Sequence, residues 1–156
     1  MIKKKTIFAL IVLHFSVSIV GQTKEWSLPA LFFKNKSIAY DTLFNYPYNT
    51  ENIKDTVNVT KFVAKILSEN PELNVTVIGL SDTKESGKDS TLSYRRANKV
   101  KGFLIGEGIV ENRIKVRGKA NQNPFILDKA IKKASCADDK ERLRRLNRRV
   151  VFILTK

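Results

Sequence analysis

The sequence predicts an α/β (α+β) two-layer sandwich, in which helices pack on one face of a small mixed β-sheet. Short apolar runs typical of buried strands alternate with segments whose apolar residues recur every three or four positions. Residues that favour turns separate these segments. The resulting order is strand, helix, strand, helix, strand, short helix, strand. Packing about four strands against two long helices and one short helix is the simplest way to bury one face of each element.

Two strands and one helix are predicted in the first half of the chain. The first strand covers residues 30–33, and the second covers 75–78, which are β-branched throughout and precede Gly79. Between them, residues 55–69 carry one apolar helical face before the Asn-Pro stop. That face comprises Val59, Phe62, Val63, Ile66 and Leu67. Residues 38–55, rich in tyrosine, asparagine and threonine, are interpreted as an irregular excursion.

Two further strands and two helices complete the predicted domain. Ser90 is expected to cap the second long helix, which ends at glycines 106 and 108. Its inner face comprises Ala97, Val100 and Leu104. A third strand follows at 114–118, and the last strand covers 150–154. Between them, acidic residues precede basic ones in 138–145, which suits the dipole of a short helix.

The first 21 residues have the features of a cleavable signal peptide. Three lysines precede an apolar run from Thr6 to Val20, and the small Gly21 suits cleavage. As a helix this run would rise about 22 Å, which is short of the roughly 30 Å hydrocarbon layer. No cysteine follows the run to carry a lipid. We therefore expect an exported single domain at 22–156, with its core at about 30–156 and no membrane span in the mature chain.

Charge and composition limit the classes of function that the protein can have. The whole chain has a net charge of +14, and removal of the three lysines in the signal leaves +11. Such a charge favours polyanionic partners, and export makes nucleic acid an unlikely one. The only histidine, His14, lies in the signal, and Cys136 is the only cysteine. Zinc sites, disulfides and histidine-dependent catalysis are therefore not expected, and the protein is predicted to be a non-enzyme without a cofactor.

Several motifs together point to a family. One strand ends in Gly79-Leu80-Ser81-Asp82, the next helix carries Leu92-Ser93-Tyr94-Arg95-Arg96-Ala97, and the last strand begins at Asn147-Arg148-Arg149-Val150. In this order, over roughly residues 30–156, these motifs resemble the OmpA-like peptidoglycan-binding domain. That family carries Gly-His-Thr-Asp, Leu-Ser-x-x-Arg-Ala and Asn-Arg-Arg-Val at these places.

The resemblance implies non-covalent binding of peptidoglycan through the diaminopimelate of its peptide stem. By position, Asp82 corresponds to the acidic ligand and Arg96 to the basic one. Asn35 is similar to a polar contact after the first strand, and Arg148 to a late arginine that closes the pocket. Asp89 occupies a contact position usually held by asparagine. Diaminopimelate carries an ammonium and a carboxylate on one carbon, so an adjacent anion and cation would suit it.

The residues themselves leave other interpretations open. Spacing alone favours either Asp82 capping a turn with Arg96 on a solvated face, or a plain ion pair between Asp82 and Arg96. Leu80, Ser81 and Asp89 depart from the family pattern, and a second carboxylate at 89 would disfavour the ligand's own carboxylate.

Three alternatives to specific binding follow from these departures and from the charge. The protein could be an envelope scaffold module with weak or no peptidoglycan binding, a nonspecific polyanion binder, or a signal-anchored form resembling the wall-binding part of a flagellar stator. A periplasmic location at the cell wall or outer membrane is expected, with a possible envelope partner protein.

Overall fold

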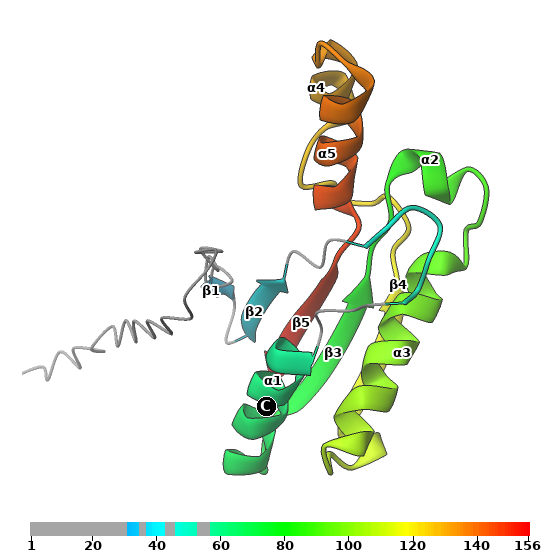
Figure 1. Cartoon of the computed structure of the whole chain (residues 1–156). Helices are drawn as coiled ribbons and strands as arrows, with labels where there is room; N and C mark the ends of the chain where they lie inside the picture. Colours follow the sequence, from blue (N-terminus) through cyan, green and yellow to red (C-terminus); the bar gives the residue numbers. More distant parts are fainter. Residues whose placement is uncertain (1–30, 35–36, 43–45, 53–56) are drawn as a thin grey trace, which may run out of the picture.

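The computed structural model describes residues 31–34, 37–42, 46–52 and 57–156. These residues form a mixed α/β domain built around a five-stranded sheet (Figure 1). The strands are β1 (Leu31–Lys34), β2 (Ser37–Thr42), β3 (Asn74–Gly79), β4 (Ile114–Gly118) and β5 (Val150–Thr155). The helices are α1 (Val57–Glu69), α2 (Thr83–Ser86), α3 (Leu92–Gly106), α4 (Asp128–Lys133) and α5 (Ala137–Asn147), with a 3₁₀ turn at Glu111–Arg113.

The strand order in the sheet is β1-β2-β5-β3-β4. The central strand, β5, runs antiparallel to both β2 and β3, and Phe152 stands opposite Tyr40 on one side and Val77 on the other. The β3–β4 pair is parallel, so its connection must cross over, and α3 provides that crossover. The sheet is therefore mixed, as predicted.

The hydrophobic core lies between the sheet and the helices α1 and α3. In β5, Val150, Phe152 and Leu154 are buried while the alternate residues are half-buried, so one face of the strand points into the core. Buried side chains of α1 and α3 meet this face, and in Figure 1 the two helices run alongside the lower part of the sheet. The helices α4 and α5 stand together beyond the opposite end of β5. The two-layer prediction is confirmed for this core.

The prediction of an irregular excursion at 38–55 is wrong for its first part. Residues 37–42 form β2, which pairs with β1 on one side and β5 on the other. These residues lack a continuous apolar run, so their own sequence does not predict a strand. The strand depends instead on its pairing with β1 and β5. The sheet therefore has five strands instead of about four. Residues 46–52 lie outside helices and strands, as expected.

Two further details differ from the prediction. The helix expected to be capped by Ser90 begins at Leu92, its N-cap residue is Thr91, and that side chain makes no capping hydrogen bond. The short helices α2 and α4 were not predicted, since each has too few residues for an apolar period to show. Within the described part of the chain, no helix is long and apolar enough to cross a membrane.

Candidate functional site

Close packing of α3 on β3 and β4 builds the corner that contains the predicted site. A Cβ atom on Gly79 would lie 1.8 Å from the carbonyl oxygen of Ser93, and one on Gly118 would lie 2.7 Å from the backbone nitrogen of Tyr94. Only glycine permits such an approach between backbones. The contact holds the first turns of α3 against the ends of both strands. It thereby places Arg96 beside the chain that leaves β3, where Arg96 Nη1 donates to the Leu80 carbonyl at 3.2 Å.

Asp82 lies buried where the chain enters α2, with 1% of its surface exposed. One carboxylate oxygen accepts the backbone N–H of Glu85 at 2.9 Å, so Asp82 caps α2. The other oxygen accepts from Nε of Arg148. Asp82 therefore has both a helix cap and a buried ion pair within the protein.

Arg96 is fully buried and is bound to Glu85 rather than to Asp82. Its Nη1 and Nη2 donate to the two Glu85 carboxylate oxygens, each at 2.8 Å, which is the paired geometry that a guanidinium offers a carboxylate. Nε donates to the Thr50 carbonyl at 2.9 Å. The Tyr46 ring lies 4.4 Å from the guanidinium carbon. Arg96 is thus held on both its polar edge and its flat face.

Arg148 joins Asp82, the N-cap of α2, and Glu85 of α2 to Glu141 of α5. Besides the Asp82 contact, its Nη1 and Nη2 donate to Glu141 at 2.7 and 3.2 Å, and its Nε lies 3.5 Å from Glu85 Oε1. Burial acts to lower the pKa of Arg148, but the hydrogen bonds to Glu141 and Asp82 outweigh it, and the pKa is raised. The guanidinium therefore stays charged although it is buried. We call the buried residues Asp82, Glu85, Arg96 and Arg148, together with the half-buried Glu141, the buried ion cluster.

Residues 46–52, which we call the covering segment, lie over this cluster. The backbone N–H of Asn49, a residue with φ of 55°, donates to Glu85 Oε1 at 2.7 Å. The Tyr48 ring lies 5.2 Å from the Arg148 guanidinium. Further along, Glu51 pairs with Arg95 of α3 at 2.7 Å. The covering segment thus contacts Glu85 and Arg148 of the cluster, and Arg95 on the outer side of α3.

Burial raises the pKa of Tyr46 well above its usual range, against the opposing effect of Arg96. The phenol is therefore neutral at physiological pH, and its ring serves as an apolar and π surface on the guanidinium. This residue closes the cluster from the side of the covering segment.

The predicted site residues are only partly brought together. Asp82, Arg96 and Arg148 meet in the buried ion cluster. Asp89 lies outside it, where hydrogen bonds from Arg95 at 2.7 Å and from Thr91 lower its pKa. Asn35 lies outside the described residues.

Sequence reasoning did not find Glu85 and Glu141 as members of the cluster. Glu85 lies in a one-turn helix whose position depends on the Asp82 cap, and no family motif includes it. Glu141 belongs to the acidic start of the predicted short helix, but that pattern could not indicate which arginine it binds.

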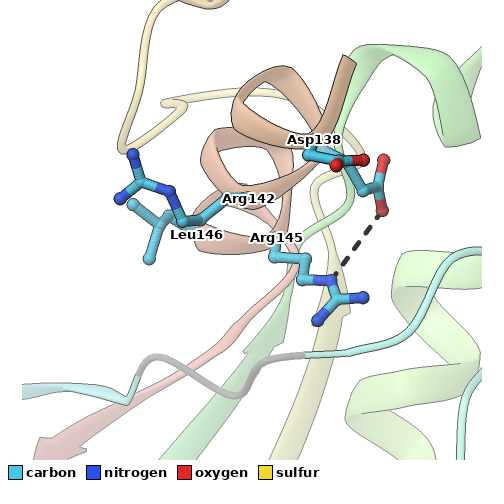
Figure 2. Close-up of a pocket in the computed structure, with 5 residues that line it drawn as sticks. Asp138, Arg142, Arg145 and Leu146 are labelled. Atoms are coloured by element: carbon cyan, nitrogen blue, oxygen red, sulfur yellow. Dashed lines mark ion pairs between the residues drawn. The ribbon is translucent and has the colours of Figure 1, made fainter. Parts of the chain in front are cut away.

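A separate surface pocket lies along α5. Figure 2 shows its lining, with Arg142 and Leu146 on one side of the helix and Asp138 and Arg145 on the other. The complete lining is Asp138, Glu141, Arg142, Arg145 and Leu146. Glu141 belongs to both the pocket and the cluster, because it lies 3.9 Å from Arg145 Nε and also pairs with Arg148. Among the described residues, no group of histidine, cysteine and acidic side chains is placed to hold a metal ion.

The sheet, its two covering helices and the charged corner between β3 and α3 define the class of OmpA-like α/β domains. The family model described as the OmpA family matches residues 46–137, which is more than half of the chain, and the protein belongs to this family. The predicted family is thereby confirmed. Among curated proteins, none matches the chain.

Solved structures show the same fold. The periplasmic domain of Helicobacter pylori MotB is 19% identical with a TM-score of 0.64, and the match covers 81% of this chain and 88% of that one. A MotB-like protein from Desulfovibrio vulgaris is 18% identical with a TM-score of 0.61, covering 82% and 78%. The OmpA-like domain of FopA1 from Francisella tularensis is 14% identical with a TM-score of 0.60, covering 81% and 79%. At these identities the likeness establishes the fold.

Proposed function

We propose that this protein is a non-catalytic domain that binds peptidoglycan in the bacterial cell envelope, through the diaminopimelate of the peptide stem. The observation that supports this most is the convergence of Asp82, Arg96 and Arg148 on one cluster in an OmpA-family fold. In the proposed complex, Asp82 accepts from the ligand's ammonium. Arg96 and Arg148 face its carboxylate, together with backbone N–H groups at the start of α3.

Ligand binding would require rearrangement, because Asp82 and Arg96 each already bind a partner within the protein. Asp82 is bound to Arg148, and Arg96 is bound to Glu85. The covering segment lies over both, and its hydrogen bonds to the cluster are Asn49 N–H to Glu85 and Arg96 Nε to the Thr50 carbonyl. We propose that its displacement admits the stem peptide. Asp89 and Asn35 remain proposed outer contacts, based on the family pattern.

The proposed location is the periplasm, at the cell wall or outer membrane, after removal of residues 1–21 as a signal peptide. The relatives of known structure include periplasmic domains, which supports this location. A partner protein in the envelope would supply any attachment to a membrane. The net positive charge would raise the rate of encounter with an anionic wall.

A second candidate is an interaction or scaffold module that keeps the fold but binds peptidoglycan weakly or not at all. One observation favours it: Asp82, Glu85, Arg96 and Arg148 are each exposed by 1% or less and neutralise one another. Such a cluster could serve the corner as a purely structural element.

Sedimentation with purified sacculi tests the proposed function. Asp82→Asn keeps the size of the side chain but removes its charge, so binding should be lost, whereas Asp138→Asn changes an exposed aspartate and should bind like the natural protein. Circular dichroism would verify that both variants fold. Sedimentation by Asp82→Asn equal to that of the natural protein would refute the assigned site, and absence of binding by the natural protein would favour the scaffold module.

A further inference from the structure

Glu85 is a buried acidic residue that the proposed ligand contacts do not use. It is 1% exposed, and both of its oxygens are engaged. Oε2 accepts from Arg96, while Oε1 accepts from Arg96 and from the backbone N–H of Asn49. These three hydrogen bonds fix the Glu85 carboxylate in place.

The Arg96 guanidinium has little capacity left for a second carboxylate. It carries five N–H groups in a fixed planar arrangement. Four of them have protein acceptors, which are the two Glu85 oxygens and the carbonyls of Thr50 and Leu80. Its flat face is covered by Tyr46. A ligand carboxylate could therefore make two parallel bonds only after Glu85 had left.

Expelling Glu85 is costly because the cluster has no spare cation to receive it. Arg148 already binds Asp82 and Glu141 and lies 3.5 Å from Glu85. A free ligand carboxylate would add a further negative charge to a cluster that already has three carboxylates and only two guanidinium groups. An ammonium adds no such repulsion and can compete for the carboxylates directly.

We propose that Glu85 is a specificity-determining residue that occupies Arg96 in place of a ligand carboxylate. The inference rests on the proposed function: it keeps the contact between Asp82 and the ligand's ammonium, and it replaces the proposed contact between Arg96 and the ligand's carboxylate. The site takes stem peptides whose third residue presents its ammonium without a free neighbouring carboxylate, such as amidated diaminopimelate. The protein therefore gains nothing from the free carboxylate that distinguishes unmodified diaminopimelate.

Calorimetric titration with two peptides tests this inference. The probes are the tripeptide L-alanyl-γ-D-glutamyl-meso-diaminopimelate and the same peptide amidated only at the diaminopimelate carboxylate that shares a carbon with the free ammonium. We expect the natural protein to bind the amidated peptide at least as tightly as the unmodified one. In Glu85→Ala, Arg96 becomes available, and the ratio of the two affinities should shift toward the unmodified peptide by about tenfold or more.

Two further variants make the result decisive. Glu85→Gln keeps the side chain's size and the acceptor for Asn49, so it provides the same comparison if Glu85→Ala fails to fold, and it should shift the ratio in the same direction. Glu111→Ala removes an equal charge at an exposed site next to Lys101, and its ratio should equal that of the natural protein.

The outcomes separate the two proposals. If the natural protein binds the unmodified peptide about tenfold or more tightly and Glu85→Gln leaves that ratio unchanged, Glu85 has no role in specificity, although peptidoglycan binding stands. If neither the natural protein nor any folded Glu85 variant binds either peptide or sacculi, the proposed function itself fails. Binding of the unmodified peptide that appears only when Glu85 is replaced would support the inference.

Discussion

Replacing Gly79 by alanine should destabilise the protein strongly, because β3 and α3 touch there through their backbones. The new Cβ would lie 1.8 Å from the Ser93 carbonyl oxygen and 3.2 Å from the backbone nitrogen of Ala97. Ordinary contact begins at 3.4 Å, so the helix and strand would have to separate by 1.6 Å. Overpacking a core typically costs about 1–3 kcal/mol, and here backbone rather than side chain must move. We expect a loss of about 3 kcal/mol or more.

Urea unfolding followed by circular dichroism measures this loss. With a slope of about 1.5–2 kcal/mol per molar urea, the midpoint should fall by about 1.5–2 M. Gly102→Ala is the matched control, since it lies in α3 with no atom within 4 Å of the new Cβ. Alanine is the better helix former, so this control should gain up to about 1 kcal/mol. A midpoint for Gly79→Ala within about 0.3 M of the natural protein would refute the close-approach argument.

Three further substitutions test the buried cluster and its surroundings. Arg96→Leu removes both close ion-pair bonds of the buried Glu85 and leaves it only the 3.5 Å ion-pair contact with Arg148, so it should cost about 3–5 kcal/mol in urea unfolding. The double change of Arg96 and Glu85 to leucine should recover much of this loss. A double variant no more stable than Arg96→Leu would contradict the predicted cost of the buried charge. Asn147→Ala removes side-chain bonds to the N–H and carbonyl of Ile126, both 2.8 Å, and should cost about 1–3 kcal/mol; a loss below about 0.5 kcal/mol would contradict that role. Burial raises the pKa of Tyr46, so above pH 10.0 its ionisation in the unfolded chain should lower the stability of the fold. Tyr46→Phe should weaken this decline in stability at alkaline pH. Equal dependence of stability on pH in the variant and the natural protein would exclude this effect.

Most of the fold follows from local signals. The β-branched run at 75–78, the apolar period at 59–67 and the apolar run at 150–154 each predict an element that the structure contains. In contrast, β2 could not be predicted from its own residues. It lies between β1 and β5, so the hydrogen bonds on both of its sides come from segments that the local sequence does not specify.

Three members of the buried ion cluster were predictable from the sequence, but their pairings were not. Motif positions indicated Asp82, Arg96 and Arg148, and all three lie in the cluster. The expected facing pair, however, was Asp82 with Arg96. The capped turn of α2 instead presents Glu85 to Arg96, and Asp82 binds Arg148 from the start of β5. Which carboxylate meets which guanidinium depends on one helical turn and on side-chain rotamers, and spacing along the chain cannot specify either.

The central place of β5 has a consequence for biosynthesis. A chain made only as far as residue 149 holds the β1–β2 hairpin and the β3–β4 pair, but it lacks the strand that joins them. The six residues of β5 pair with both halves of the sheet through contacts distant in sequence. The complete sheet can therefore form only after β5 has been translated. Until then β2 and β3 each lack the neighbouring strand that pairs with their inner edge.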